Sequence, residues 1–265
     1  MCDSCGCNVT SGNVHLLKDD QGKDGPAVDV LKALLSENDR QAAHNREHFD
    51  LHGVLAINLM SSPGAGKTAL LEATIDAMRD ELRFAVIEGD LETEKDAQRI
   101  RAKGIPAIQI TTGTACHLDA HLVHDALHHL PLAGLDVVFI ENVGNLVCPA
   151  SFDLGQHFNV VMLSVTEGDD KPAKYPVMFR AADLVLVSKV DLLDVIDDFD
   201  LGRARAAVRA LGRDTLVRTV SMRRDAWIGP WTDWLRQIVE AHRATLRPAP
   251  PARALARALT PPLHA

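Results

Sequence analysis

Short apolar segments alternate with segments of helical periodicity along most of the chain. Seven of the short apolar segments are rich in β-branched and other apolar residues, which is typical of strands that are buried on both faces of a sheet. These candidate strands are Val54–Met60, Phe84–Glu88, Ala107–Thr111, Asp136–Glu141, Val160–Val165, Leu184–Ser188 and Leu216–Val220. The candidate helices between and after them are Lys67–Leu82, Thr93–Lys103, Leu118–Leu130, Leu201–Leu211 and Trp231–Thr245. The alternation predicts an α/β fold with a mostly parallel sheet flanked by helices on both faces.

The two ends of the chain differ in composition from this alternating region, which spans residues 53–246. Residues 1–26 combine three early cysteines with a polar stretch, which predicts a metal-binding motif on a flexible tether. In residues 27–52 the apolar residues have helical spacing, which predicts one helix that leads into the main domain. Residues 247–265 are rich in Pro and Ala, and we expect them to form a disordered tail.

The composition narrows the class of protein. Lys and Arg total 28 of the 265 residues and Asp and Glu total 36, which leaves a formal net charge of −8. This balance argues against a nucleic-acid partner, because nucleic-acid-binding proteins need a basic face. No apolar run approaches the about 18 residues of a membrane span, and the N-terminus lacks a signal-peptide pattern. We therefore expect a cytoplasmic protein without a membrane partner, in which five cysteines favour metal binding or catalysis over disulfides.

Residues 61–68 (Ser-Ser-Pro-Gly-Ala-Gly-Lys-Thr) follow an apolar strand and precede a helix. This is the context of a phosphate-binding loop (P-loop), in which glycines let backbone N–H groups converge on phosphate oxygens. Lys67 is expected to reach the β- and γ-phosphates, and the Thr68 hydroxyl to bind Mg²⁺. Ser61 replaces the usual first glycine, and an ordinary glycine-containing turn is the alternative. The nucleotide-binding residues predicted here are Gly64, Ala65, Gly66, Lys67, Thr68 and Ala69.

A second pattern indicates which base is bound. Residues 188–191 (Ser-Lys-Val-Asp) end a candidate strand and resemble the guanine-reading pattern Asn-Lys-x-Asp, with Ser in place of Asn. The Asp191 carboxylate only accepts hydrogen bonds, which suits the two N–H groups on the Watson–Crick edge of guanine. Lys189 is expected to lie across the base, and Ser221 begins the last loop expected to contact it. Guanine is therefore preferred over adenine, which disfavours the alternative of a small-molecule kinase on this scaffold.

Carboxylates at two strand ends are candidates for chemistry with Mg²⁺ and water. Asp90 follows one strand, and Glu141 ends the next core strand shortly before Gly144. In P-loop proteins such carboxylates hold Mg²⁺, and a following glycine offers its N–H to the γ-phosphate. We assign Lys67, Asp90 and Glu141 to catalysis, Asp90 also to Mg²⁺, and Gly144 to the nucleotide. A helix cap is the alternative role for either carboxylate.

One candidate metal site combines Cys116, His117 and Cys148. These residues lie in loops that follow strands, and a parallel sheet brings such loops to one edge. Two thiolates and an imidazole suit Zn²⁺ or Ni²⁺, and buried cysteines acting as small hydrophobic groups are the alternative. Because Cys148 follows Gly144 closely, we expect the nucleotide state to change the affinity of this site for metal.

The N-terminal cysteines form a second candidate metal site. Cys2, Cys5 and Cys7 are too few for a closed four-thiolate zinc site, but with the α-amine as fourth ligand they favour Ni²⁺. A tail without function is the alternative. Three further histidines recur at helical spacing, where a solvated polar face is favoured over a shared metal ion; they are His121, His124 and His128.

Five segments together resemble one family, the type B accessory GTPases that insert nickel during maturation of nickel–iron hydrogenase. The segments are Cys2–Cys7, Asn58–Thr68, Gly113–Ala120, Glu141–Pro149 and Val165–Pro172. The resemblance implies a P-loop GTPase of the metallochaperone type, which binds GTP or GDP. It implies a tight nickel site at the N-terminal cysteines and a weaker nickel or zinc site at the Cys-His-Cys set. It also implies GTP- and metal-dependent homodimers that deliver nickel, with a second hydrogenase nickel accessory protein, to the hydrogenase large subunit.

Two alternatives to this function stay open. One is a GTPase chaperone for another metalloenzyme, such as urease or a cobalamin enzyme, and the other is a nickel or zinc store or sensor that is insensitive to nucleotide. The sequence contains no evident arginine finger, which predicts slow intrinsic hydrolysis. Leu192, Leu193 and Ile196 are candidates for a dimer surface, and core packing is the equally favoured alternative.

Overall fold

The computed structural model describes residues 26–212, 214–223 and 227–246. The predicted N-terminal site and the predicted C-terminal tail lie outside the described residues. Within the described part, the helix α1 (Pro26–His52) leads into the main domain. Its position agrees with the apolar periodicity of residues 27–52.

The core of the molecule is one sheet of seven parallel strands in the order β3-β2-β4-β1-β5-β6-β7. The strands are β1 (Leu55–Ser61), β2 (Phe84–Asp90), β3 (Ala107–Thr111), β4 (Val137–Glu141), β5 (Phe158–Ser164), β6 (Leu184–Ser188) and β7 (Leu216–Thr219). Every residue of β1 is buried, since this central strand is covered on both faces. The predicted P-loop α/β fold with a parallel sheet is confirmed.

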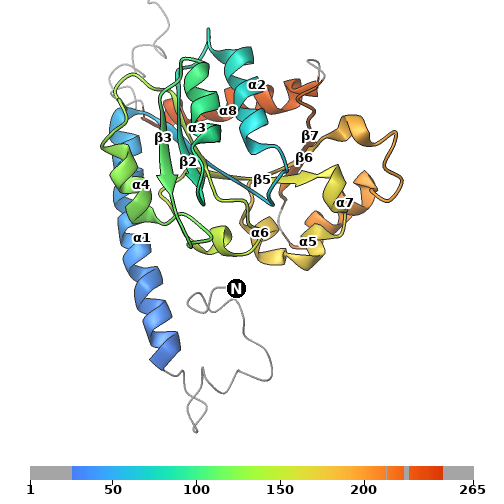
Figure 1. Ribbon diagram of the computed structural model, residues 1–265, viewed down its shortest axis with the longest axis horizontal. Helices are drawn as coiled ribbons and strands as arrows, with labels where there is room; N and C mark the ends of the chain where they lie inside the picture. Colours follow the sequence, from blue (N-terminus) through green and yellow to red (C-terminus); the bar gives the residue numbers. More distant parts are fainter. Residues whose placement is uncertain (1–25, 213, 224–226, 247–265) are drawn as a thin grey trace, which may run out of the picture.

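Helices cover both faces of the sheet (Figure 1). In this view α2, α3 and α8 lie above the sheet, α5, α6 and α7 lie below it, and α1 runs beside α4. Their bounds are α2 (Lys67–Met78), α3 (Lys95–Ala102), α4 (Ala120–Leu127), α5 (Lys171–Lys174), α6 (Pro176–Ala181), α7 (Leu201–Arg209) and α8 (Gly229–Leu246). The helices predicted from periodicity are all present, but most are shorter than expected. For example, α2 ends at Met78 rather than at Leu82.

The hydrophobic core has one continuous cluster under α2, α3 and α8 and two separate clusters on the opposite face. In the first cluster the indole N–H of Trp231 donates a 2.8 Å hydrogen bond to the hydroxyl of Thr74. On the opposite face, Asn142 donates to Asn58 at 3.3 Å and Asn58 donates to Asn159 at 3.1 Å. These buried amides satisfy one another, and Asn142 is thereby held at the edge of the sheet where the functional loops begin.

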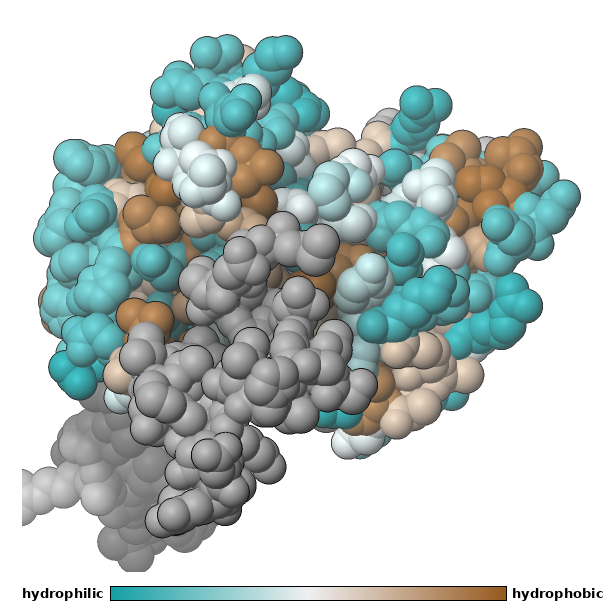
Figure 2. All heavy atoms as spheres, turned by 60° about the horizontal axis from the view of Figure 1, so that its bottom comes forward, coloured by the Kyte–Doolittle hydropathy of each residue, from teal (hydrophilic) through white to brown (hydrophobic). Residues whose placement is uncertain are grey.

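The segment after β6 contains the apolar residues predicted for a dimer surface or for core packing. Leu193 and Ile196 are half-buried and pack against one core cluster, Leu192 is half-buried as well, and Val195 is 73% exposed. The packing agrees with the core alternative for Leu193 and Ile196, and the dimer surface stays a prediction. Figure 2 shows one face of the molecule, on which hydrophobic residues gather in separate small patches among hydrophilic ones. None of the helices in the described ranges is both long enough and apolar enough to cross a bilayer.

Candidate functional site

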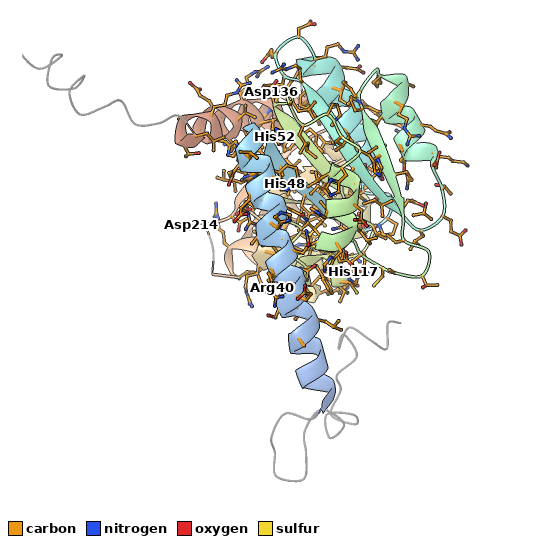
Figure 3. The ribbon with its side chains drawn as sticks, turned by 90° about the vertical axis from the view of Figure 1, so that its left-hand side faces the viewer. Arg40, His48, His52, His117, Asp136 and Asp214 are labelled. Atoms are coloured by element: carbon orange, nitrogen blue, oxygen red, sulfur yellow. The ribbon has the colours of Figure 1, made fainter. Side chains whose placement is uncertain are left out.

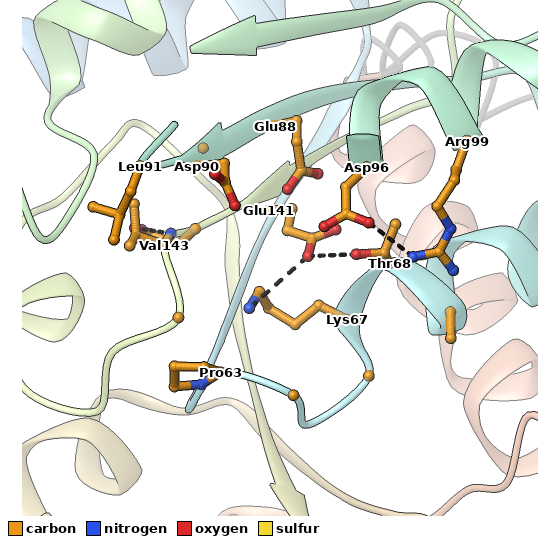
Figure 4. A pocket seen from close by; sticks show the side chains of 16 residues that line it. Pro63, Lys67, Thr68, Glu88, Asp90, Leu91, Asp96, Arg99, Glu141 and Val143 are labelled. Carbon is orange, nitrogen blue, oxygen red and sulfur yellow. Dashed lines mark hydrogen bonds and ion pairs between the residues drawn. The ribbon is translucent and has the colours of Figure 1, made fainter. Parts of the chain in front are cut away.

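A cavity of about 360 Å³ opens where β1, β2 and β4 end (Figure 4). Its walls come from the loop after β1, the end of β2, the start of α3 and the segment after β4. Most residues predicted to bind nucleotide or Mg²⁺ line it, namely Gly64, Gly66, Lys67, Thr68, Ala69, Asp90, Glu141 and Gly144. Ala65 is fully buried behind them. The structure therefore brings these predicted site residues together in one place.

The loop before α2 has the backbone of a phosphate-binding loop. Gly64 and Gly66 have φ values of 77° and 101°, in the left-handed region that favours glycine, and α2 begins directly at Lys67. The Lys67 ammonium donates to the Ser61 hydroxyl at 3.3 Å. Ser61, which stands where glycine is usual, thus supplies a buried contact to the lysine expected to bind phosphate.

Three carboxyl groups lie close together, and one of them accepts a hydrogen bond from the hydroxyl predicted to bind Mg²⁺. Thr68 Oγ1 donates to Glu141 Oε1 at 3.0 Å, and oxygens of Glu88, Asp96 and Glu141 lie within 4.8 Å of one another. One oxygen of Glu88 and one of Glu141 are buried without a hydrogen-bond partner. Such unpartnered carboxylate oxygens beside a hydroxyl are the donor set of a hard divalent cation, so the residues present fit Mg²⁺.

Burial controls the protonation of this acidic group. Burial and the adjacent Glu141 carboxyl raise the pKa of Glu88 to about 11, so this side chain holds a proton at neutral pH. Burial also raises the pKa of Glu141, while the Lys67 ammonium, 3.9 Å from Glu141 Oε1, acts in the opposite direction. Ionising two adjacent buried carboxyl groups costs much free energy, because the two negative charges repel each other, unless a cation binds between them.

Asp90 lines the cavity and is also hydrogen-bonded to the turn that follows it. Its Oδ1 accepts hydrogen bonds of 2.9 Å from the backbone N–H groups of Glu92 and Thr93. Burial alone raises the pKa of Asp90, but these N–H groups lower it overall. Asp90 therefore stays ionised and caps the turn at the mouth of the cavity. The acidic side chains next to Glu141 are those of Glu88 and Asp96.

Two residues of the acidic group, Glu88 and Asp96, were missed from the sequence. Glu88 had a visible signal, because it is a charged residue inside the otherwise apolar segment of β2. Asp96 had no such signal in the sequence. It lies in a helix and accepts a 2.8 Å hydrogen bond from Arg99 Nη1, as many acidic residues on protein surfaces do. Arg99 also donates to both oxygens of Glu72, so this arginine at the cavity wall is neutralised by two carboxylates.

The predicted guanine-reading loop is tied directly to the phosphate-binding loop. The Ser188 hydroxyl donates to the carbonyl of Ala65 at 2.8 Å, and the Lys189 ammonium donates to the carbonyl of Gly64 at 2.7 Å. Lys189 is the one residue other than glycine with positive φ, 58°, in the described part of the chain. The Ser221 hydroxyl donates to Asp191 Oδ1 at 2.6 Å, which orients the carboxylate predicted to bind guanine. The loop predicted to read the base is thus hydrogen-bonded to the loop predicted to bind the phosphates.

The Cys-His-Cys set also comes together at this edge of the sheet. Ligand atoms of Cys116, His117 and Cys148 lie within 4.8 Å of one another, with Cys116 Sγ 3.6 Å from His117 Nδ1. The ring of His117, labelled in Figure 3, stacks on Phe152 with 3.9 Å between ring centroids. Burial lowers the pKa of His117, which favours the neutral imidazole that binds metal ions. These three residues could hold one Zn²⁺ or Ni²⁺ ion.

Asn145 joins the nucleotide cavity to this metal-ligand set. Its backbone N–H donates to the carbonyl of Ser61 at 2.8 Å, and its side-chain amide donates to the carbonyl of Cys116 at 3.2 Å. Its Oδ1 accepts from the N–H of Val147, next to Cys148. Just before it, Gly144 packs so closely on Pro63 that an added Cβ would lie 2.9 Å from the proline backbone. The loop after β4 therefore contacts both sites at once.

Comparison with known proteins agrees with this geometry. A family model described as CobW/HypB/UreG, nucleotide-binding domain, matches residues 55–214. The hydrogenase maturation factor HypB of Rhizobium leguminosarum bv. viciae is 48% identical over 242 residues, which cover 89% of this chain and 80% of that protein. HypB of Escherichia coli K12 is 46% identical over 230 residues, covering 84% of this chain and 79% of that protein.

Solved structures give the same result. The crystal structure of HypB from Helicobacter pylori in complex with nickel has a TM-score of 0.74 and 40% identity, and covers 81% of this chain and 99% of that chain. Sequence motifs, fold, site geometry and relatives thus agree on one family. The chain belongs to the CobW/HypB/UreG family of P-loop nucleotide-binding domains and, within it, to the hydrogenase maturation factors HypB.

Proposed function

We propose that this chain is a GTP-hydrolysing nickel metallochaperone that gates the delivery of nickel to a hydrogenase large subunit by its nucleotide state. The observation that carries the proposal is the position of Asn145, which contacts the phosphate-binding loop through its backbone and the Cys116 loop through its side chain. A change at the phosphates can thereby move a ligand of the proposed metal site. The nickel complex of the related Helicobacter pylori HypB supports nickel as the cargo.

Different residues of the chain would bind the phosphates, the base, Mg²⁺ and the attacking water. Lys67 and the N-terminus of α2 would bind the phosphates, and Gly144, which lines the same cavity, would offer its N–H to the γ-phosphate. Asp191 accepts from the guanine edge, held in place by Ser221. Thr68, Glu141 and Glu88 would hold Mg²⁺, which when bound supplies positive charge to the β- and γ-phosphate oxygens. Asp90 lies at the cavity mouth, where an ionised carboxylate can orient water.

Hydrolysis by this site alone is expected to be slow. An arginine that stabilises the transition state accelerates GTP hydrolysis by about 10³- to 10⁵-fold in P-loop enzymes. Arg99 lines the cavity, but its guanidinium is bound by Glu72 and Asp96 and is not directed at the phosphates. Slow turnover suits a switch, because the GTP-bound state then lasts long enough to be read by a partner.

Metal would be handled at two places. We propose that the Cys116, His117 and Cys148 site holds nickel or zinc in a nucleotide-dependent way. The N-terminal cysteines, Cys2, Cys5 and Cys7, would bind nickel more tightly, and they lie outside the described residues. A homodimer that forms with GTP and metal, a second nickel accessory protein and the hydrogenase large subunit complete the proposed pathway of transfer.

The test is a titration of the reduced chain with Ni²⁺ and with Zn²⁺, each in GDP and in a non-hydrolysable GTP analogue. Thiolate-to-metal charge-transfer absorbance and native mass report metal binding, and the Cys2/Cys5/Cys7→Ala variant separates the two sites. We expect the variant to keep one site whose affinity differs between the two nucleotides. Equal affinity in both nucleotides would refute gating and favour a nucleotide-insensitive store or sensor.

A second measurement tests delivery. Nickel transfer to a purified hydrogenase large subunit, with the second accessory protein present, is followed with wild type and with Lys67→Ala. Because Lys67 binds the phosphates, we expect the variant to load nickel at the N-terminal cysteines but to deliver it at a strongly reduced rate. Delivery at the wild-type rate by Lys67→Ala would contradict a role for the nucleotide.

A further inference from the structure

Two groups of histidines lie outside the sites described above, and in one of them, His157 with His242, the ring of His157 is already fully hydrogen-bonded. In that group, His157 Nδ1 accepts a 2.9 Å hydrogen bond from the backbone N–H of Ala56. His157 Nε2 must therefore carry the ring proton, which it donates to Asp50 at 2.9 Å. With both ring nitrogens used, His157 ties α1 to the sheet and is not a metal ligand.

The other group gathers four imidazoles on two adjacent helices. His44 and His48 lie one helical turn apart on α1, and His124 and His128 lie one turn apart at the end of α4, which packs beside α1. Figure 3 shows the molecule from the α1 side, with His48 labelled on that helix. The ring centroids of His44 and His48 are 5.0 and 5.6 Å from that of His124, and those of His124 and His128 are 4.6 Å apart.

The hydrogen bonds around Asn45 determine the tautomer of His124. Asn45 is fully buried, and its amide nitrogen donates to the carbonyls of Ala120 at 2.7 Å and Leu154 at 3.1 Å. The amide oxygen of Asn45 must then face His124 Nδ1, which lies 3.1 Å away and has to carry the proton. His124 Nε2 is left with its lone pair. A buried oxygen that holds one ring N–H and frees the other nitrogen is the usual support of a metal-binding histidine.

The two Nε2 atoms have the spacing of two ligands in a metal site. Since His124 Nε2 keeps its lone pair, His128 Nε2 donates a 3.2 Å hydrogen bond to it, and His128 must move this proton to Nδ1 for its Nε2 to bind an ion. Two imidazole nitrogens bound at about 2.0–2.1 Å to one ion in tetrahedral geometry lie about 3.3–3.4 Å from each other. A pair of histidines at positions i and i+4 of a helix is a recurrent way to provide these two ligands.

The α1 histidines can complete the coordination. His48 is half-buried and His44 is exposed, so each can turn about its side-chain bonds toward the His124–His128 pair.

We propose that His124 and His128, with His48 and His44 from α1, bind one divalent transition-metal ion of the zinc and nickel class between α1 and α4. The site uses imidazole ligands alone, so it differs from the thiolate sites in both chemistry and place. It does not depend on the nucleotide function proposed above. Because α4 starts shortly after His117, the ion would be held on the helix that adjoins the Cys116–His117 loop.

The test compares two matched double variants of the full chain, His124→Gln/His128→Gln and His121→Gln/His129→Gln. The second pair removes two exposed histidines of the same segment that are outside the group. Zn²⁺ and Ni²⁺ bound per chain are measured by equilibrium dialysis, with circular dichroism to verify folding. We expect the first variant to lose one equivalent of metal, or to bind it at least about tenfold more weakly, and the second to bind as wild type does. Equal binding by both variants would overturn the proposal.

A measurement on the unmodified chain tests the same site without substitutions. In ¹⁵N NMR spectra of the histidine side chains, Zn²⁺ bound at this site must change the Nε2 resonances of His124 and His128. These changes should saturate together, while those of His121 and His129 stay constant. Unchanged His124 and His128 resonances at metal saturation would refute the site even if the glutamine variant failed to fold.

Discussion

The side chain of Asn145 donates a 3.2 Å hydrogen bond to the backbone carbonyl of Cys116, while its backbone N–H holds the phosphate-binding loop at Ser61. One residue therefore contacts the loops of both proposed sites. Asn145→Ala keeps the backbone bond and removes the side-chain bond, worth about 1 kcal/mol. In wild type the affinities for nickel in GDP and in a GTP analogue should differ by some factor. We expect this factor to be about fivefold smaller in Asn145→Ala.

Val147→Ala is the matched control for this variant, since Val147 lies in the same loop with its side chain exposed. The ratio is measured by the titration in both nucleotides described for the proposed function. An unchanged ratio in Asn145→Ala, or an equal change in Val147→Ala, would show that the side-chain bond does not couple the sites.

Gly144→Ala should impair GTP hydrolysis without unfolding the protein. An added Cβ lies 2.9 Å from backbone atoms of Pro63, closer than atoms can pack, so the loop after β4 must shift away from the phosphates. Loss of one donor to a developing phosphate charge costs about 10²- to 10³-fold in kcat, and we expect a decrease in this range in single-turnover assays. Gly229→Ala, which meets no atom within 4 Å, is the control and should hydrolyse GTP at the wild-type rate. Wild-type kcat in Gly144→Ala would mean that the close contact is not required.

Asp191→Asn should weaken guanine recognition. The asparagine side chain retains one acceptor and adds a donor that opposes the N–H groups of guanine, so we expect GTP affinity to decrease at least about tenfold. Fluorescent GTP and ATP analogues measure the two affinities, and the preference for GTP over ATP should decrease with them. Asp194→Asn changes an exposed aspartate nearby and should leave both affinities unchanged. An unaltered preference in Asp191→Asn would place base recognition elsewhere.

Glu88→Gln should stabilise the protein at pH 8 when no divalent cation is present. The pKa of Glu88 is about 11 in the folded protein, because of burial and Glu141, against an ordinary value near 4.5. Between these two pH values the unfolded chain has released a proton that the folded chain keeps, so stability decreases as pH rises. The glutamine variant lacks this penalty, and we expect its Tm in EDTA to rise by about 4 °C or more at pH 8.

At pH 4 the same variant should unfold at nearly the wild-type temperature, because Glu88 is then protonated in both states. Added Mg²⁺ should raise the Tm of the variant less than that of wild type, since one carboxylate ligand is missing. The exposed Glu92 provides the control variant Glu92→Gln. A Tm difference that does not grow between pH 4 and pH 8 would contradict a buried, protonated Glu88.

Local patterns predicted the sheet and the larger helices correctly because each repeats a signal over many residues. Continuous apolar runs mark strands buried on both faces, and the glycines and lysine of the P-loop mark its backbone. The short helices α5 and α6 were not predicted, because four and six residues that start near a proline contain too little periodicity. The packing of the half-buried Leu193 and Ile196 against the core was likewise undecided from sequence, since an apolar residue on a short segment fits either a surface or a core.

The sequence by itself determined which residues carry chemistry along one loop at a time, such as Lys67 and Thr68 in the P-loop or Cys116 beside His117. Only the tertiary structure decided which loops meet. The strand order places β2 beside β4, and this brings Glu88 to Glu141. The packing of α1 on α4 brings His44 and His48 to His124. Such contacts depend on strand order and helix packing, which arise from the burial of the whole core and leave no signal in any single segment.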